Sequence, residues 1–135
     1  MMILFASVTL APSTLLYAQA SSDPFPSRVS YWNDATSGSW FSPDRWEEMR
    51  PPIGRRSGAL LALKTPYEVI VPIDLELADL YLLNPDATIG IDARTDLSIF
   101  GRLVNHGTIE INTANRSGIT RLMFNSDTHI GGDGS

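Results

Sequence analysis

Two short apolar patterns recur at nearly constant spacing in the last third of the chain, and this recurrence constrains the fold more than any other feature. The first pattern returns at equal intervals, at Thr88-Ile89, Thr108-Ile109 and Thr128-His129-Ile130. The second runs beside it at less even intervals, in 80–82, 97–99 and 122–124. Recurrence on this scale is typical of coils that each bury an apolar side on the coil below. The sequence therefore predicts a stacked β-solenoid.

Short apolar runs separated by turn residues support an all-β fold. Apolar and polar residues alternate within the later runs, as in Leu97 and Ile99 against Asp96 and Ser98, so one face should point inward. Equivalent positions of successive coils stack about 4.8 Å apart. We therefore expect an internal ladder of Ile89, Ile109 and Ile130. The alternative is an antiparallel sandwich; the solenoid is favoured because the echo spans two strands and a turn. The form that we expect is a right-handed parallel β-helix, which is the usual hand of this fold.

The N-terminal segment, residues 1–20, contains no charged side chain and holds an apolar stretch that ends in Ala18-Gln19-Ala20. This pattern predicts a helical signal peptide over the same segment. A membrane anchor and a misassigned start are the alternatives, and Pro12 and the short apolar span argue against a spanning helix. Residues 21–30 are polar and contain two prolines, which predicts a flexible N-terminus. We expect a secreted or cell-surface protein with no membrane span in its mature chain.

Composition excludes several classes of function. The mature chain of about 115 residues is long enough for one small domain. It has no cysteine, so disulfides and thiolate metal sites are excluded, and bacterial export is compatible with this. The net charge is −5, and the only basic concentration is Arg50, Arg55 and Arg56, which indicates a solvated turn. Nucleic acid is therefore not an expected partner.

All three tryptophans lie in an aromatic region that we place at residues 31–58, ahead of coils at 59–135. Three large rings this close together form either a plug or a platform. We favour a cap on the first coil, because a solenoid needs one at each end. In the alternative, Trp32, Trp40 and Trp46 stack on sugar rings, and they are the candidate ligand-binding residues.

The aromatic region, the Pro51-Pro52 turn and the coil at 97–109 together resemble a known group of proteins. They are similar to the N-terminal regions of large secreted bacterial β-helical proteins, such as autotransporter passengers and adhesin-like proteins. The resemblance covers residues 31–134 and implies a structural or adhesive, non-catalytic segment whose partners are surface glycans or other proteins. Such proteins usually continue for many coils, so the chain resembles the N-terminal piece of something longer. Further chain or a partner should cover the C-terminal coil, because an uncapped coil exposes backbone groups and an apolar cross-section.

The rival class is an enzyme, a polysaccharide-cleaving β-helical protein that uses paired carboxylates. Asp79 and Asp96 are the candidates because both head strands that we take to be equivalent, with Asp92 and Glu110 nearby. Acidic residues on outward faces are ordinary in a soluble solenoid, and fold analogy alone does not establish an activity. We predict no catalytic residue.

Two features resemble parts of metal sites. The segment Gly131-Gly132-Asp133-Gly134 matches part of a calcium-binding glycine-rich repeat, but one incomplete copy is more often a turn. His106 and His129 lie about one coil apart and could approach each other, but the sequence offers no third ligand beside them. We predict no metal and no cofactor. A third possible role for the chain is a small carbohydrate-binding module that uses the tryptophans.

Overall fold

The computed structural model describes residues 28–112, 116–125 and 127–135. This part of the chain is built of β-strands, with one 3₁₀ turn, η3 (Pro43–Arg45), as its helical element. The strands are β1 (Arg28–Tyr31), β2 (Gly38–Ser39), β3 (Gly54–Leu61), β4 (Tyr67–Val71), β5 (Leu75–Leu82), β6 (Ala87–Ile91), β7 (Asp96–Asn105), β8 (Thr108–Ile111), β9 (Arg121–Phe124) and β10 (His129–Gly131).

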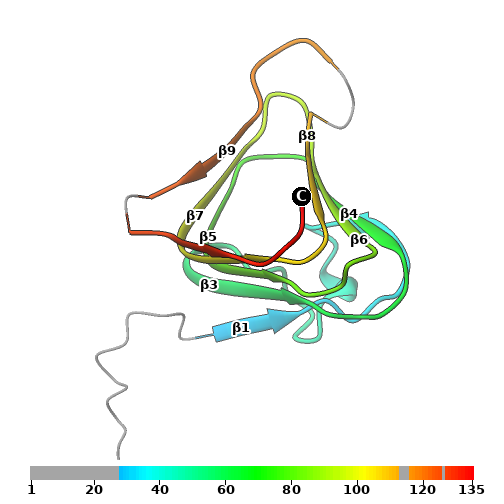
Figure 1. The fold of residues 1–135 in the computed structure, drawn as a ribbon. Coiled ribbons are helices and arrows are strands. Elements are labelled where there is room, and N and C mark those ends of the chain that lie inside the picture. The colour runs from blue at the N-terminus through cyan, green and yellow to red at the C-terminus, as the bar shows by residue number, and fades with distance from the viewer. Residues whose placement is uncertain (1–27, 113–115, 126) are drawn as a thin grey trace, which may run out of the picture.

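Every pairing between these strands is parallel, and the strands stack in two sheets. One sheet has the order β2-β4-β6-β8. The other has the order β1-β3-β5-β7-β10, with β9 also pairing with β7. Parallel strands that follow one another through short turns can pair only by winding into a coil. The described part of the chain is therefore a β-solenoid of about three turns, which confirms the predicted stacking of parallel coils (Figure 1).

The coil has three sides because β5 and β7 bend in the middle (Figure 1). The register between β5 and β7 shifts between Leu77 and Asp79, so each strand contributes to two sides. The first half of β7 pairs with β9, and the second half pairs with β10. Strands β4, β6 and β8 form the third side.

The predicted ladders are correct in part. Ile89 pairs with Ile109 of the next coil and with Val69 of the preceding coil, so these three side chains form one ladder. Ile130 does not join it, because β10 pairs with β7 and places Ile130 on Leu103. The regular interval of the first pattern holds only on the β4–β6–β8 side, and the match at Thr128 is a coincidence of spacing.

The second sequence pattern also predicts the stacking correctly in one place and wrongly in another. Leu97 to Ile99 pair with Leu122 to Phe124, as the pattern predicts. Leu80 pairs with Leu103, so the predicted stacking of Leu80 on Leu97 is wrong. The turns between strands differ in length from side to side, and a spacing that is correct on one side of the solenoid does not transfer to another.

The interior is filled by the inward-facing side chains of each side. Val69, Ile89, Leu77, Ile99 and Leu80 have no exposed surface. Burial of an aliphatic side chain of this size stabilises a fold by roughly 1.5–3 kcal/mol. Coil-to-coil stacking is therefore the main source of stability in a chain that has no disulfide.

Buried polar groups hold the corners of the coil. Asp79 lies at the bend of β5, fully buried, and its carboxylate accepts hydrogen bonds from the Arg102 backbone N–H (2.7 Å) and the Tyr81 hydroxyl (3.2 Å). Asn84 donates to the carbonyl of Thr65 (2.7 Å) at the next corner. A β-carbon at Gly107 would lie 2.5 Å from the carbonyl oxygen of Ala87, so this corner requires glycine.

Two boundaries of the predicted divisions differ from the strand positions in the structure. The predicted signal peptide and residues 21–27 lie outside the described residues. Residues 28–30, which we assigned to the flexible N-terminus, belong to β1 and pair with residues 57–59 of β3. Strand β3 begins at Gly54, inside the predicted aromatic region. Within the described residues, no helix is long and apolar enough to cross a bilayer.

Candidate functional site

The structure brings the three tryptophans together between β1 and β3. The Trp46 ring lies edge-on to Trp32, with ring centroids 5.2 Å apart, and to Trp40, with centroids 4.8 Å apart. Trp32 also stacks on Tyr67 of β4 at 6.3 Å. Such geometries are the favourable ones for aromatic pairs. The three rings and Tyr67 therefore form one cluster, which we call the aromatic cluster.

Hydrogen bonds fix the polar edges of these rings. The indole N–H of Trp40 donates to the Pro52 carbonyl (3.0 Å), and that of Trp46 donates to the Trp40 carbonyl (2.7 Å). The Trp32 indole donates to the Asp34 carbonyl. Each ring is at most 2% exposed. Sugar stacking needs a ring face open to solvent, so the burial of these rings favours a packing role over a role in ligand binding.

The polar residues beside the cluster stabilise its loop. The carboxylate of Asp34 accepts hydrogen bonds from the hydroxyl (2.7 Å) and the backbone N–H (2.9 Å) of Thr36. The Thr36 hydroxyl is the larger cause that holds the pKa of Asp34 below its ordinary value, and Arg45 adds to it at 3.4 Å. These contacts link Asp34 to Thr36 and Arg45.

Tyr67 is a member of the cluster that sequence reasoning did not single out. Its side chain is 4% exposed, and its hydroxyl has no partner of hydrogen-bond geometry within the part of the chain that the structure describes. Burial raises the pKa of Tyr67 to about 12, and the nearby Leu63 backbone offsets a part of this effect. The hydroxyl is therefore a group that titrates only in strong alkali.

The candidate carboxylates do not form a pair. Asp96 begins β7, and its equivalent one coil below is Asp74, whose carboxylate accepts a hydrogen bond from the Asp96 backbone N–H (2.9 Å). Asp79 lies inside β5, at the bend, and pairs in register with Arg102. The prediction that Asp79 and Asp96 head equivalent strands is therefore wrong, because β5 begins at Leu75.

Asp96 is paired with an arginine of the next coil. The Arg121 guanidinium donates to both carboxylate oxygens, at 2.9 and 2.7 Å. These bonds hold the pKa of Asp96 below its ordinary value. Arg55 and Glu76 form a similar link between β3 and β5 at 3.1 Å. Outward carboxylates on two strands thus connect one coil to the next.

The two histidines lie at different positions of the coil. The Nδ1 atom of His106 lies 2.6 Å from the Asp133 carboxylate, and this contact holds the pKa of Asp133 below its ordinary value. His129 lies in β10 opposite Arg102, well before the position that His106 occupies. The described residues contain no group of three histidine, cysteine or acidic side chains that could hold a metal ion.

The glycine-rich segment stacks on the turn of the coil below it. The backbone N–H of Gly134 donates to the Asn105 carbonyl (2.7 Å), and that of Ser135 donates to the Gly107 carbonyl (2.9 Å). Gly132 has a φ of 99° and approaches Asn105 so closely that a β-carbon would lie 2.1 Å from its carbonyl oxygen. The segment is therefore a turn that continues the coil.

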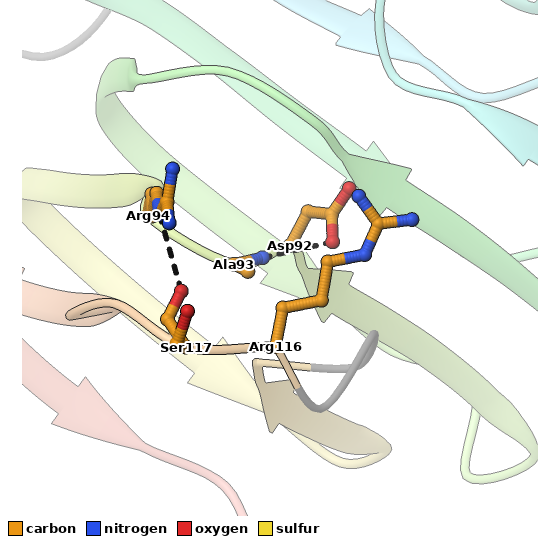
Figure 2. Close-up of a pocket in the computed structure, with 5 residues that line it drawn as sticks. All are labelled: Asp92, Ala93, Arg94, Arg116 and Ser117. Carbon is orange, nitrogen blue, oxygen red and sulfur yellow. Dashed lines mark hydrogen bonds between the residues drawn. The ribbon is translucent and has the colours of Figure 1, made fainter.

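A pocket of about 430 Å³ lies where the turn after β6 meets the segment that leads into β9 (Figure 2). It is lined by Asp92, Ala93, Arg94, Arg116 and Ser117. The Arg94 Nε–H donates to the Ser117 carbonyl (3.1 Å), and Arg116 extends toward Asp92 in Figure 2. The pocket therefore combines both signs of charge.

Sequence reasoning missed this pocket because its residues come from two separate turns and carry no motif. Arg94 adopts a φ of 60°, which is unusual for a residue with a β-carbon. Its backbone N–H donates to the Thr120 hydroxyl (3.0 Å), and that hydroxyl donates to the Asp92 carbonyl (3.1 Å). These polar groups join the two turns, and their placement depends on the register between coils.

Comparison of the chain with protein-family models, with curated proteins and with solved structures found no match. The class of protein is therefore defined by the strand pairing itself, which is that of a three-sided parallel β-solenoid with an aromatic cluster near one end.

Proposed function

We propose that this chain is a structural, non-catalytic segment of an exported β-solenoid protein that is secreted or held at the bacterial cell surface. The observation that carries this proposal is that both the inward and the outward side chains connect neighbouring coils. Inward residues form ladders from coil to coil, and the outward pairs Asp96–Arg121 and Glu76–Arg55 link neighbouring coils. A chain whose polar and apolar groups both connect coils is suited to extend a surface.

Export, the hand of the coil and the adhesive role are supported by the sequence. The apolar leader that ends in Ala18-Gln19-Ala20 supports export. The resemblance of residues 31–134 to autotransporter passengers and adhesin-like proteins supports a right-handed coil and an adhesive role. Surface glycans or other proteins are the partners in this proposal, and the coil formed by β8, β9 and β10 is covered by further chain or by a partner.

The experiment that tests the proposal follows the chain in a Gram-negative host. Mass spectrometry of the purified product should show an N-terminus at Ser21, and fractionation should place it outside the cytoplasm. The matched control is Leu15→Arg, because a charge in the apolar stretch should stop export and leave the full chain inside the cell. Uncleaved wild-type chain in the cytoplasm would overturn the proposal for export.

The non-catalytic part is tested with the same product. We expect no shortening of acidic or neutral polysaccharides, measured by release of reducing ends. Cleavage by the wild type that Asp96→Asn abolishes would overturn the structural proposal and favour the enzyme class. The substitution is suitable because it keeps the shape of a side chain that lies on the outside of the coil.

A further inference from the structure

The pocket beside Arg94 opens on the lateral surface of the solenoid. The turn between β6 and β7 and the segment between β8 and β9 project from the same corner of the coil (Figure 1). A second hollow, of about 530 Å³, lies against the same turn and is lined by Pro72, Ile73, Asp74, Ala93, Arg94 and Thr95. Because Ala93 and Arg94 line both hollows, the two are neighbours along this corner. We call the two hollows together the corner groove.

Arg94 is fixed both at its backbone and at the middle of its side chain. Its backbone N–H donates to the Thr120 hydroxyl (3.0 Å), and its Nε–H donates to the Ser117 carbonyl (3.1 Å). A β-carbon at Gly118 would lie 2.4 Å from the Arg94 Cγ, so the side chain rests directly on the backbone of this glycine. The two Nη groups make no hydrogen bond or ion pair within the described residues. The end of the guanidinium is therefore held in place and open to a ligand, which lowers the entropy cost of binding.

Arg116 supplies a second guanidinium from the next coil. The side-chain amide of Asn112 donates to the Arg116 carbonyl (2.9 Å) and accepts from its backbone N–H (3.2 Å). The backbone N–H of Asn112 in turn donates to the Ile91 carbonyl (2.8 Å), which ties the segment to the coil below. The Arg116 guanidinium extends toward Asp92 (Figure 2), and it has no ion-pair partner in the part of the chain that the structure describes.

The corner groove also contains negative charge. One oxygen of the Asp92 carboxylate accepts a hydrogen bond from the Ala93 backbone N–H (2.8 Å). In the second hollow, the Asp74 carboxylate accepts from the Asp96 backbone N–H (2.9 Å). Asp96, and to a smaller degree Asp74, raise the pKa of Arg121, so the charge of this arginine offsets a part of theirs. The groups available to a ligand in the first hollow are thus two guanidinium ends and one carboxylate.

We propose that the corner groove binds a uronate-bearing glycan, and that Arg94 and Arg116 hold the sugar carboxylate. A guanidinium presents a planar fork of N–H donors that matches the two oxygens of a carboxylate, and such bonds are strengthened by charge. The carboxylate of Asp92 accepts hydrogen bonds from the hydroxyl groups of the same sugar unit. A uronate offers both partners at once, because hydroxyl groups surround its single carboxylate.

Asp92 makes the pocket selective among anions. Its carboxylate repels a second negative charge placed close to the first, and this disfavours densely charged sulfate and phosphate polymers. The net charge of −5 acts in the same direction. The pocket is therefore suited to a ligand with one carboxylate for each sugar unit.

Ile73 adds an apolar contact beside the charged pocket. Its side chain is 60% exposed and lines the second hollow, on the turn one coil below Arg94. The C–H face of a sugar ring is apolar and packs on such a side chain. Successive coils lie about 4.8 Å apart, so neighbouring units of one glycan reach both hollows. Binding of two linked units makes an oligosaccharide a tighter ligand than a single sugar.

The proposal names the class of glycan for the adhesive role, and in that sense it rests on the proposed function. Its test is an NMR titration of the purified full chain with tetragalacturonate. We expect a dissociation constant of about 0.05–1 mM, as for a ligand held by a few charged hydrogen bonds. The backbone signals of Asp92 and Ala93 and the Nε–H signals of Arg94 and Arg116 should shift. The fully methyl-esterified tetrasaccharide is the control ligand, since it lacks only the charge, and it should not bind.

Substitutions locate the site. Arg94→Gln and Arg116→Gln should each raise the dissociation constant at least tenfold, because each removes charged hydrogen bonds to the ligand. Arg56→Gln is the matched control, since it removes the same charge from an exposed side chain of β3 and should bind like the wild type. Thermal unfolding followed by circular dichroism shows that each variant is folded.

A substitution at Asp92 tests the selectivity. The wild type should not bind dextran sulfate. Asp92→Asn should bind tetragalacturonate several-fold more weakly, because the amide is a poorer acceptor for the sugar hydroxyls, and it should gain binding of dextran sulfate.

Four results would overturn the proposal. They are no binding of tetragalacturonate by the wild type up to about 10 mM, equal binding of its methyl ester, a loss in Arg56→Gln equal to that in Arg94→Gln, and tighter binding by Asp92→Asn. Equal losses in the two arginine variants would indicate attraction by overall charge alone. Each of these results leaves the export assay unaffected, so the failure of one proposal can be told from the failure of the other.

Discussion

At the end of the solenoid near β1 and β2, three indole rings fill the space inside the coil, and each ring is at most 2% exposed. At the end formed by β8, β9 and β10, the core-facing positions carry Ile111, Phe124 and Ile130, which are 41–62% exposed. Within the described residues, the outermost strands at both ends have a neighbouring coil on one side only. At the first end, which we call the closed end, the rings are buried, and at the second, which we call the open end, core-facing side chains are exposed among the described residues.

Burial in a solenoid is thus a property of position along the stack. Phe124 and Ile99 occupy the same register position on neighbouring coils, yet Ile99 has no exposed surface. An inward direction alone does not bury a side chain, since a coil must also lie above it. Residues at the two ends should therefore differ in their contribution to stability.

The largest expected effect is that of Trp40→Ala at the closed end. Removal of a fully buried ring that contacts Trp46 should lower the free energy of unfolding by about 3–5 kcal/mol. The matched change at the open end is Phe124→Ala. It should lower the free energy of unfolding by about 1–2 kcal/mol, because the ring is already partly exposed.

Urea unfolding followed by circular dichroism measures both changes. Equal losses at the two ends would contradict the comparison. A Trp40→Ala variant that unfolds like the wild type, but no longer binds to immobilised glycans, would show instead that the aromatic cluster is a sugar platform.

A second, smaller effect is expected at high pH and again belongs to the closed end. The pKa of Tyr67 is raised to about 12 in the folded protein, against an ordinary value of 10. Between these values the unfolded chain releases a proton that the folded chain keeps, so stability is intact below pH 10 and falls as the pH rises toward 12. The expected loss is roughly 2–3 kcal/mol.

Tyr67→Phe should remove this alkaline loss and should not destabilise the protein at pH 7, because the hydroxyl has no hydrogen-bond partner among the described residues. Tyr31→Phe is the control, since Tyr31 is exposed and should leave the alkaline loss in place. Unfolding midpoints in urea at pH 8, 10 and 11.5 decide between these outcomes. An unchanged alkaline loss in Tyr67→Phe would show that another group causes it.

The smallest expected effect is acid sensitivity near the open end. Arg121 holds the pKa of Asp96 below its ordinary value of 3.8. The stabilisation is therefore present above pH 3.8 and is lost as the pH falls through the lower, folded-state pKa. Both side chains are solvent-accessible, so the change in melting temperature should be slight.

Asp96→Asn and Arg121→Gln should reduce the acid sensitivity of the melting temperature to the same extent. Thermal unfolding between pH 5 and pH 2, read by circular dichroism, measures it. A difference between the two variants would mean that one of the side chains has another partner in this pH range.

The architecture could be predicted because it depends on local pattern. Alternation over 96–111 defined inward and outward faces, and the rung from Ile89 to Ile109 followed from the regular spacing of the first pattern. The same method failed at Ile130, which stacks on Leu103, and at Leu80, which stacks on the same residue from the other side. The lengths of the turns decide these registers, and turn length leaves little trace in the hydrophobic pattern.

The candidate sites, like the fold, could be predicted only where they depend on residues close together in the sequence. The sequence placed Trp32, Trp40 and Trp46 close together, because they follow one another in one short segment. Their complete burial depends on Tyr67 and on strands that lie far along the chain. The bend that buries Asp79 beneath Arg102 likewise arises from a register shift between two strands, so the carboxylate could not be told from an ordinary outward acid.

The sequence by itself determined the all-β character of this protein, its coiled stacking and the inward face of its strands, because these follow from apolar spacing and turn residues that are local to the chain. Only the tertiary structure decided which strands lie above one another, which carboxylates are paired and which core-facing side chains are buried. Those properties depend on contacts between positions at least one coil apart, and such contacts are set by the sum of every turn between them.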